Sequence, residues 1–98
     1  MAKEIIWTHR AANDRYSILD YFIERNKSNT YSIKLDNEFR EAIEHISQDP
    51  RCGLPTDRDA RKYLVGKGNY YIIYQETLMS INILRIWDNR QDPERLKY

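Results

Sequence analysis

The clearest pattern along the chain is a stripe of apolar residues in its second quarter. Their separations of three and four positions predict a helix that begins after a cap at Ser28 or Asn29 and ends before Pro50. A second stripe predicts a preceding helix over residues 9–25, with Thr8 as its cap. The apolar positions of the two stripes are Ala11, Ala12, Ile18, Leu19, Phe22 and Ile23, then Leu35, Phe39, Ala42, Ile43 and Ile46.

Only the polar residues 26–29 separate the two predicted helices. So short a connection makes neighbouring helices antiparallel, and we therefore expect a helical hairpin. Its outward faces are acidic, and a solvated surface is the favoured interpretation of them. The acidic residues are Asp14, Asp20, Glu24, Asp36, Glu38, Glu41 and Glu44.

Four runs rich in β-branched and aromatic residues predict strands. They cover residues 3–8, 60–65, 70–74 and 78–87, and the segment 51–57 between the second helix and the second strand is expected to be a loop. Polar turns at 66–69 and 75–77 join the last three strands into two successive hairpins. In the last run, alternation places Met79, Ile81 and Ile83 on one face, opposite Ser80 and Asn82.

The predicted order is strand, helix, helix, strand, strand, strand. This order indicates an α+β domain in which the helical hairpin packs on one face of an antiparallel sheet. With 98 residues, the chain is expected to form one domain over residues 1–98. The other face of the sheet is expected to be open or half open, and its tyrosines and basic residues make it a candidate binding surface.

The small net charge of +1 hides an uneven distribution. Residues 1–57 contain eight Lys or Arg against ten Asp or Glu, a net charge of −2, whereas residues 58–98 contain eight against five, a net charge of +3. An anionic partner is therefore expected at the sheet half of the chain. No apolar run approaches the length of a membrane span, and Cys52 is the only cysteine, so a cytoplasmic protein without disulfides is expected.

The sequence contains few residue patterns that are typical of a catalytic site. His9 and His45 are far apart, and no cluster has the spacing of metal ligands, so no metal or other cofactor is expected. What remains is a set of basic and tyrosine residues on or beside the sheet, of the types that bind phosphate and stabilise charge in a metal-independent ribonuclease. Asp88 and Tyr98 are the available groups for proton transfer. The alternative is that Arg85 pairs with Asp88 and that the tyrosines pack.

The sequence resembles the RelE/ParE superfamily of toxins from bacterial type II toxin–antitoxin modules. The resemblance is carried by the segment YYIIY at 70–74 and by INILRIWDNR at 81–90. Further similarities are Trp7 and Thr8 ahead of the first helix, Pro50 and Gly53 after the second, and Arg61 at the start of the next strand. The order and spacing of these pieces cover nearly the whole chain.

The resemblance implies the fold predicted above and a toxin that a cognate antitoxin neutralises in a hetero-oligomeric complex. ParE-like members of the superfamily poison DNA gyrase, whereas RelE-like members cut mRNA on the ribosome. In a RelE-like enzyme the catalytic residues would be Arg61, Arg85 and Tyr98. The residues expected to bind nucleic acid or another target are Lys62, Tyr70, Tyr71 and Arg90.

Three features favour the ParE-like branch. The predicted hairpin is long, and position 71, where many superfamily members carry Arg, is Tyr71. The low net charge also suits a ribosomal RNA target poorly, because neutralisation of phosphates supplies much of such affinity. A RelE-like ribonuclease and an inactive, antitoxin-binding member remain the alternatives.

Overall fold

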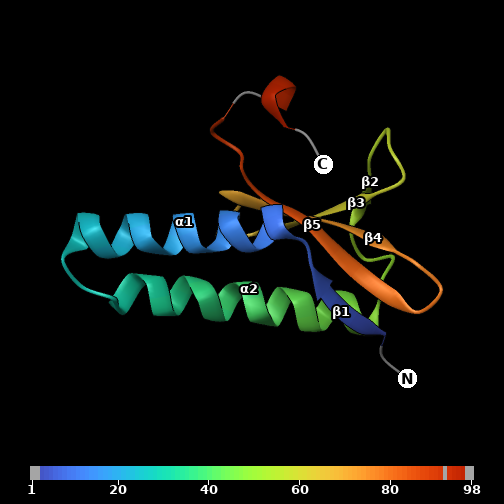
Figure 1. Cartoon of the computed structure of the whole chain (residues 1–98), viewed down its shortest axis with the longest axis horizontal. Helices are drawn as coiled ribbons and strands as arrows, with labels where there is room; N and C mark the ends of the chain where they lie inside the picture. The colour runs from blue at the N-terminus through green and yellow to red at the C-terminus, as the bar shows by residue number, and fades with distance from the viewer. Residues whose placement is uncertain (1–2, 92, 97–98) are drawn as a thin grey trace.

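The helical hairpin forms one layer of the molecule. The computed structural model describes residues 3–91 and 93–96, and it contains α1 (His9–Asn26) and α2 (Thr30–Gln48) side by side (Figure 1). The Thr8 hydroxyl accepts a hydrogen bond from the backbone N–H of Ala11 at 3.2 Å, which confirms Thr8 as the cap. Asn29 occupies the cap position of α2, and the neighbouring Ser28 hydroxyl accepts a hydrogen bond from the backbone N–H of Thr30.

The second layer is a five-stranded sheet in the order β1-β5-β4-β3-β2. The predicted α+β architecture is confirmed, but the sheet is mixed, because β1 runs parallel to β5. The expected loop also contributes a two-residue edge strand, β2. Periodicity identifies a strand but not the direction of its neighbours, which depends on where the hairpin returns the chain to the sheet. The strands are β1 (Glu4–Trp7), β2 (Leu54–Pro55), β3 (Arg61–Val65), β4 (Tyr70–Glu76) and β5 (Ser80–Asp88).

The turn between β4 and β5 lies two residues later than predicted. Leu78 and Met79 are exposed in this turn rather than in a strand, so the prediction that Met79 shares a strand face with Ile81 and Ile83 is wrong. Thr77 and Ser80 close the turn, because each backbone N–H donates to an oxygen of the other residue. The prediction that Ile81 and Ile83 share a face is confirmed, since both are fully buried in the main core.

The main core lies between the hairpin and the sheet. It contains apolar side chains from both helices and from the strands: Ala11, Leu35, Phe39, Ala42, Ile46, Val65, Tyr70, Ile72, Tyr74, Ile81, Ile83 and Ile86. A smaller cluster of Ala60, Ile73 and Trp87 lies on the opposite face, where Leu96, beside the short 3-10 helix η1 (Pro93–Arg95), packs against it. The face expected to be open is therefore half covered.

Two of the acidic residues expected to be solvated instead make partly buried ion pairs that join separate elements. Asp36 lies 2.7 Å from the Nε of Arg15 and joins α2 to α1. Asp14 lies 2.7 Å from the Nε of Arg85 and joins α1 to β5. The interpretation of the acidic face as fully solvated is therefore wrong at these two positions. Neither described helix is long and apolar enough to cross a membrane.

Candidate functional site

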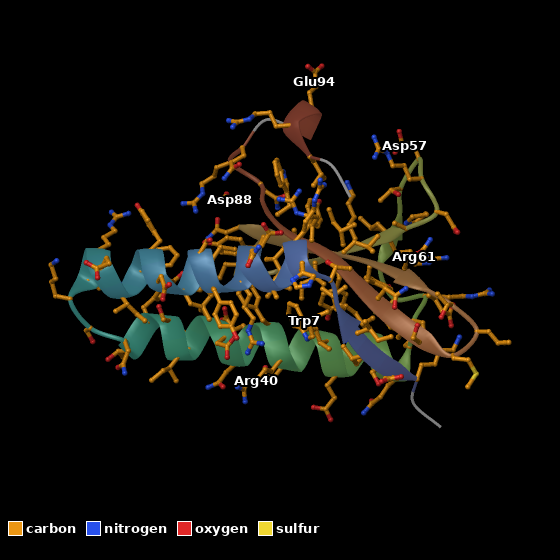
Figure 2. All side chains as sticks on the ribbon, viewed as in Figure 1. Trp7, Arg40, Asp57, Arg61, Asp88 and Glu94 are labelled. Carbon is orange, nitrogen blue, oxygen red and sulfur yellow. The ribbon has the colours of Figure 1, made fainter. Side chains whose placement is uncertain are left out.

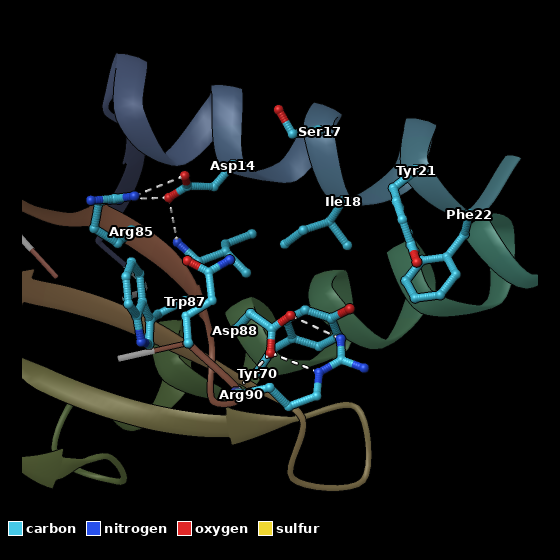
Figure 3. Close-up of a pocket in the computed structure, with 12 residues that line it drawn as sticks. Asp14, Ser17, Ile18, Tyr21, Phe22, Tyr70, Arg85, Trp87, Asp88 and Arg90 are labelled. Carbon is cyan, nitrogen blue, oxygen red and sulfur yellow. Dashed lines mark hydrogen bonds and ion pairs between the residues drawn. The ribbon is translucent and has the colours of Figure 1, made fainter. Parts of the chain in front are cut away.

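Two hollows flank the C-terminal half of β5, and together they contain most of the predicted site residues. The first, which we call the groove, lies between α1 and β5 and has a volume of about 480 Å³ (Figure 3). It is lined by Asp14, Ser17, Ile18, Tyr21, Phe22, Tyr70, Arg85, Ile86, Trp87, Asp88, Arg90 and Gln91.

Asp14 holds one end of the groove together. Its carboxylate accepts hydrogen bonds from Nε of Arg85 at 2.7 Å, from Nη2 of Arg85 at 3.1 Å and from the backbone N–H of Ile86 at 3.0 Å. The pairing of β1 with β5 stops at Ile83, so the edge of β5 beyond that residue has no neighbouring strand. Asp14 therefore satisfies a backbone donor that the sheet leaves without a partner.

A second ion pair lies at the other end of the groove. Nε and Nη2 of Arg90 donate to the two carboxylate oxygens of Asp88 at 2.9 and 2.8 Å. The hydrogen bonds from Arg90 hold the pKa of Asp88 below its usual value, and the same contact raises the pKa of Arg90. The predicted alternative that Arg85 pairs with Asp88 is wrong, because each of these residues has a different partner.

Tyr70 lines the groove but is mainly a residue of the core. Its side chain is only 2% exposed, and its ring packs edge to face against Phe39 with 5.8 Å between the ring centroids. Burial raises the pKa of its hydroxyl. Tyr70 therefore offers little surface to the target that the sequence assigned to it.

The second hollow, which we call the cup, lies on the face of the sheet opposite the helices. It has a volume of about 500 Å³. The ammonium group of Lys62 lies 4.7 Å from the centroid of the Tyr71 ring. The lining residues are Pro55, Thr56, Asp57, Arg58, Lys62, Tyr71, Ile73, Trp87, Asn89, Gln91 and Leu96.

Arg61 precedes Lys62 in β3, but its side chain points toward the helical layer. It donates a hydrogen bond to the carbonyl oxygen of Gly53 at 2.8 Å. Figure 2 shows Arg61 at the end of the molecule opposite the connection between α1 and α2. The Tyr74 hydroxyl accepts from the backbone N–H of Gly53 and donates to the carbonyl of Pro50, and burial raises its pKa to about 12. A Cβ at Gly53 would lie 2.6 Å from the Tyr74 hydroxyl, so this loop requires glycine. Arg61 therefore braces the loop after α2.

The structure thus divides the predicted site residues. Lys62 and Tyr71 meet in the cup, Arg85 and Arg90 line the groove, and Arg61 lies apart from both. Tyr98 lies outside the described residues. Sequence reasoning missed Asp14, because a carboxylate on the outward side of a helix gives no signal of its partner in a distant strand.

No chemistry involving a metal or a reactive thiol is supported by the described residues. In residues 3–91 and 93–96, no three His, Cys, Asp or Glu side chains are grouped closely enough to hold a metal ion. Burial raises the pKa of the Cys52 thiol, which makes it a poorer nucleophile.

Comparisons with known proteins agree with this fold. The family described as ParE toxin of type II toxin-antitoxin system, parDE, matches residues 5–93. A solved structure titled "Chromosomal ParDE TA system from P. aeruginosa" matches with a TM-score of 0.77 at 20% identity. That match covers 89% of this chain and 96% of the other, and at this identity it shows similarity of fold alone. No curated protein sequence matches the chain.

Proposed function

Because the chain belongs to the ParE toxin family of type II toxin–antitoxin systems, we propose that it inhibits DNA gyrase by binding and does not cut RNA. The chain is the toxin component of such a module, and its partner is a cognate antitoxin. The proposal concerns the target. A gyrase target also implies a cytoplasmic protein.

The state of the two arginines of the predicted catalytic set carries this proposal. A metal-independent ribonuclease needs cationic groups free to meet the charge that develops on the scissile phosphate. Arg85 instead donates twice to Asp14, and the two side chains are only 16% and 18% exposed. Arg61 donates to the backbone carbonyl of Gly53, in the loop after α2 and away from the groove. Both groups are therefore occupied in holding the fold together.

We assign the antitoxin to the groove. Its walls carry the apolar and aromatic side chains of Ile18, Tyr21 and Phe22, which are of the kinds that dominate the centres of protein interfaces. Its charges are matched within the chain, so a largely apolar segment can enter without leaving a charge unpaired. This assignment leaves the cup available to the target.

Supercoiling by purified gyrase tests the proposal. Increasing amounts of the toxin should abolish supercoiling of relaxed plasmid DNA, and addition of the antitoxin should restore it. Translating ribosomes incubated with the same toxin should keep their mRNA intact. Unaffected supercoiling at saturating toxin, or codon-dependent cleavage of the mRNA, would contradict the proposal.

Expression of the chain without its antitoxin separates an active toxin from an inactive family member. An active gyrase inhibitor should stop growth, and induction of the toxin together with the antitoxin should restore it. Continued growth at a verified level of folded toxin would favour the third alternative, a chain retained for antitoxin binding.

A further inference from the structure

We propose that the cup binds a short, extended and acidic segment of the protein that the toxin inhibits. In this complex the Lys62 ammonium meets a carboxylate, and an adjacent apolar side chain packs against Pro55 and Leu96, which also line the cup. The inference rests on the proposed function, because it names the chemistry of the contact between toxin and target.

The unmatched charge of Lys62 is the first argument. Within residues 3–91 and 93–96, Lys62 has no carboxylate within ion-pair distance, and its contact is with the Tyr71 ring. An aromatic ring positions an ammonium group but does not neutralise it. By contrast, Arg85 and Arg90 in the groove each have a carboxylate partner. Asp57 also lines the cup but makes no ion pair with Lys62. A cation held in a hollow without an ion-pair partner is suited to an anionic group from outside.

The shape of the cup is the second argument. Ile73 and Trp87 are buried beneath it, whereas Pro55 is exposed and Leu96 is partly exposed, so these two residues offer the apolar surface. An α-helix with its side chains is about 10–12 Å across, so a hollow of about 500 Å³ would hold barely one turn. An extended segment is narrower than a helix and fits a hollow of this size. One acidic side chain would lie at Lys62, and one apolar side chain would lie at the apolar residues of the lining.

A nucleic acid fits the cup less well than an acidic protein segment does. Sequence-tolerant binding of single strands depends on aromatic faces on which bases stack. Trp87 is only 8% exposed, and the Lys62 ammonium lies over the ring of Tyr71. The net charge of +1 also provides little attraction for a polyanion. The rings of Trp87 and Tyr71 are therefore not open for stacking with a base.

Reversing the charge at the cup tests the inference in the full-length toxin. Lys62→Glu should raise the toxin concentration for half-inhibition of gyrase by about tenfold or more, whereas Lys62→Arg should stay within about threefold of the wild type, since the cation remains. Lys34→Glu on the exposed surface of α2 makes the same change of charge and serves as the matched control. It should change inhibition by less than about twofold.

Two further readouts separate binding at the cup from general damage to the fold. Affinity for the antitoxin should be unchanged in Lys62→Glu, because the antitoxin is assigned to the groove. Binding of gyrase by the wild type should weaken as salt rises from 50 to 200 mM, and Lys62→Gln should reduce this dependence. Equal inhibition by Lys62→Glu and the wild type would overturn the inference while leaving gyrase as the target.

A peptide probe tests the cup independently of gyrase. The peptide Leu-Glu-Glu-Leu should shift the NMR signals of the Lys62 side chain and the Tyr71 ring, and Leu-Gln-Gln-Leu should not. If the acidic peptide binds there but gyrase is unaffected by the toxin, the inference stands and the proposed target falls. If the cup ignores the peptide, or if an oligonucleotide shifts the same signals instead, the inference is wrong.

Discussion

The groove and the cup lie on either side of β5 and share Trp87 and Gln91 in their linings, yet they treat charge in opposite ways. In the groove, each of two arginines faces an aspartate of the same chain. In the cup, Lys62 faces an aromatic ring. Both hollows combine basic and aromatic residues, so composition alone does not distinguish them.

This difference separates charges that hold the fold together from charges that a partner can use. Asp14 and Arg85 bring α1 against the end of β5, and a ligand would have to displace one of them to reach the other. Lys62 joins no two elements through an ion pair among the described residues, so its charge is not needed for the fold. The comparison predicts that damage on the groove side lowers stability and that damage on the cup side lowers binding.

The largest contrast should come from two neighbouring isoleucines of β4. Ile72 points into the main core, and Ile73 points into the small cluster beneath the cup; they are 0% and 1% exposed. We expect Ile72→Ala to lower the free energy of unfolding by about 4 kcal/mol and Ile73→Ala by about 2 kcal/mol, since the smaller cluster can collapse around the lost methyl groups more easily. Urea unfolding measures both values.

Leu64→Ala is the control for this pair, because Leu64 is an exposed residue of the adjacent strand. It should change the free energy of unfolding by less than about 0.5 kcal/mol. Equal losses for Ile72→Ala and Ile73→Ala would show that the two faces of the sheet contribute alike.

A smaller contrast is expected between the charged residues themselves. Asp14→Asn should lower the free energy of unfolding by about 2 kcal/mol, because it leaves a mostly buried guanidinium without its counter-charge. Lys62→Met should change it by less than about 0.5 kcal/mol. The double variant Asp14→Asn with Arg85→Met should lose less than the sum of the single variants, with a coupling energy of about 1 kcal/mol.

Urea unfolding of the four proteins completes the double-mutant cycle. Strict additivity would mean that Asp14 and Arg85 do not stabilise the fold through each other. A loss for Lys62→Met as large as that for Asp14→Asn would remove the distinction between the two hollows.

The smallest expected effect concerns acid. The pKa of Asp88 is lower in the folded protein than in the unfolded chain, because Arg90 donates hydrogen bonds to the ionised carboxylate. The resulting stabilisation is present above the unfolded pKa of about 4 and is lost as the pH falls through the folded pKa. For a pair whose arginine is largely exposed, we expect about 0.5 kcal/mol.

The free energy of unfolding of the wild type should therefore fall below about pH 4, and Asp88→Asn should make that decrease shallower. Arg90→Gln should have the same effect, because it removes the other half of the pair. A decrease of unchanged steepness in both variants would show that this ion pair does not contribute.

Local patterns predicted the helices and most strands within a few residues. The stripe that includes Leu35 and Phe39, the cap at Thr8 and the alternation of Ile81 and Ile83 each depend on residues close together in the chain. The turn at Leu78 and Met79 was misplaced because two apolar residues resemble a strand in sequence. The parallel pairing of β1 with β5 was not predictable from either strand alone.

The candidate site also combines features that local sequence predicts with features that depend on distant parts of the chain. The family resemblance, the basic character of the sheet half and the placement of Lys62 in a strand next to a tyrosine-rich strand were all predictable from the order of the residues. The folded chain was needed to show which partners Arg61 and Lys62 have, and that Arg85 is neutralised by Asp14, 71 positions earlier in the chain. Periodicity is a property of neighbouring residues, whereas the state of a charge depends on which groups the fold brings within a few ångströms of it.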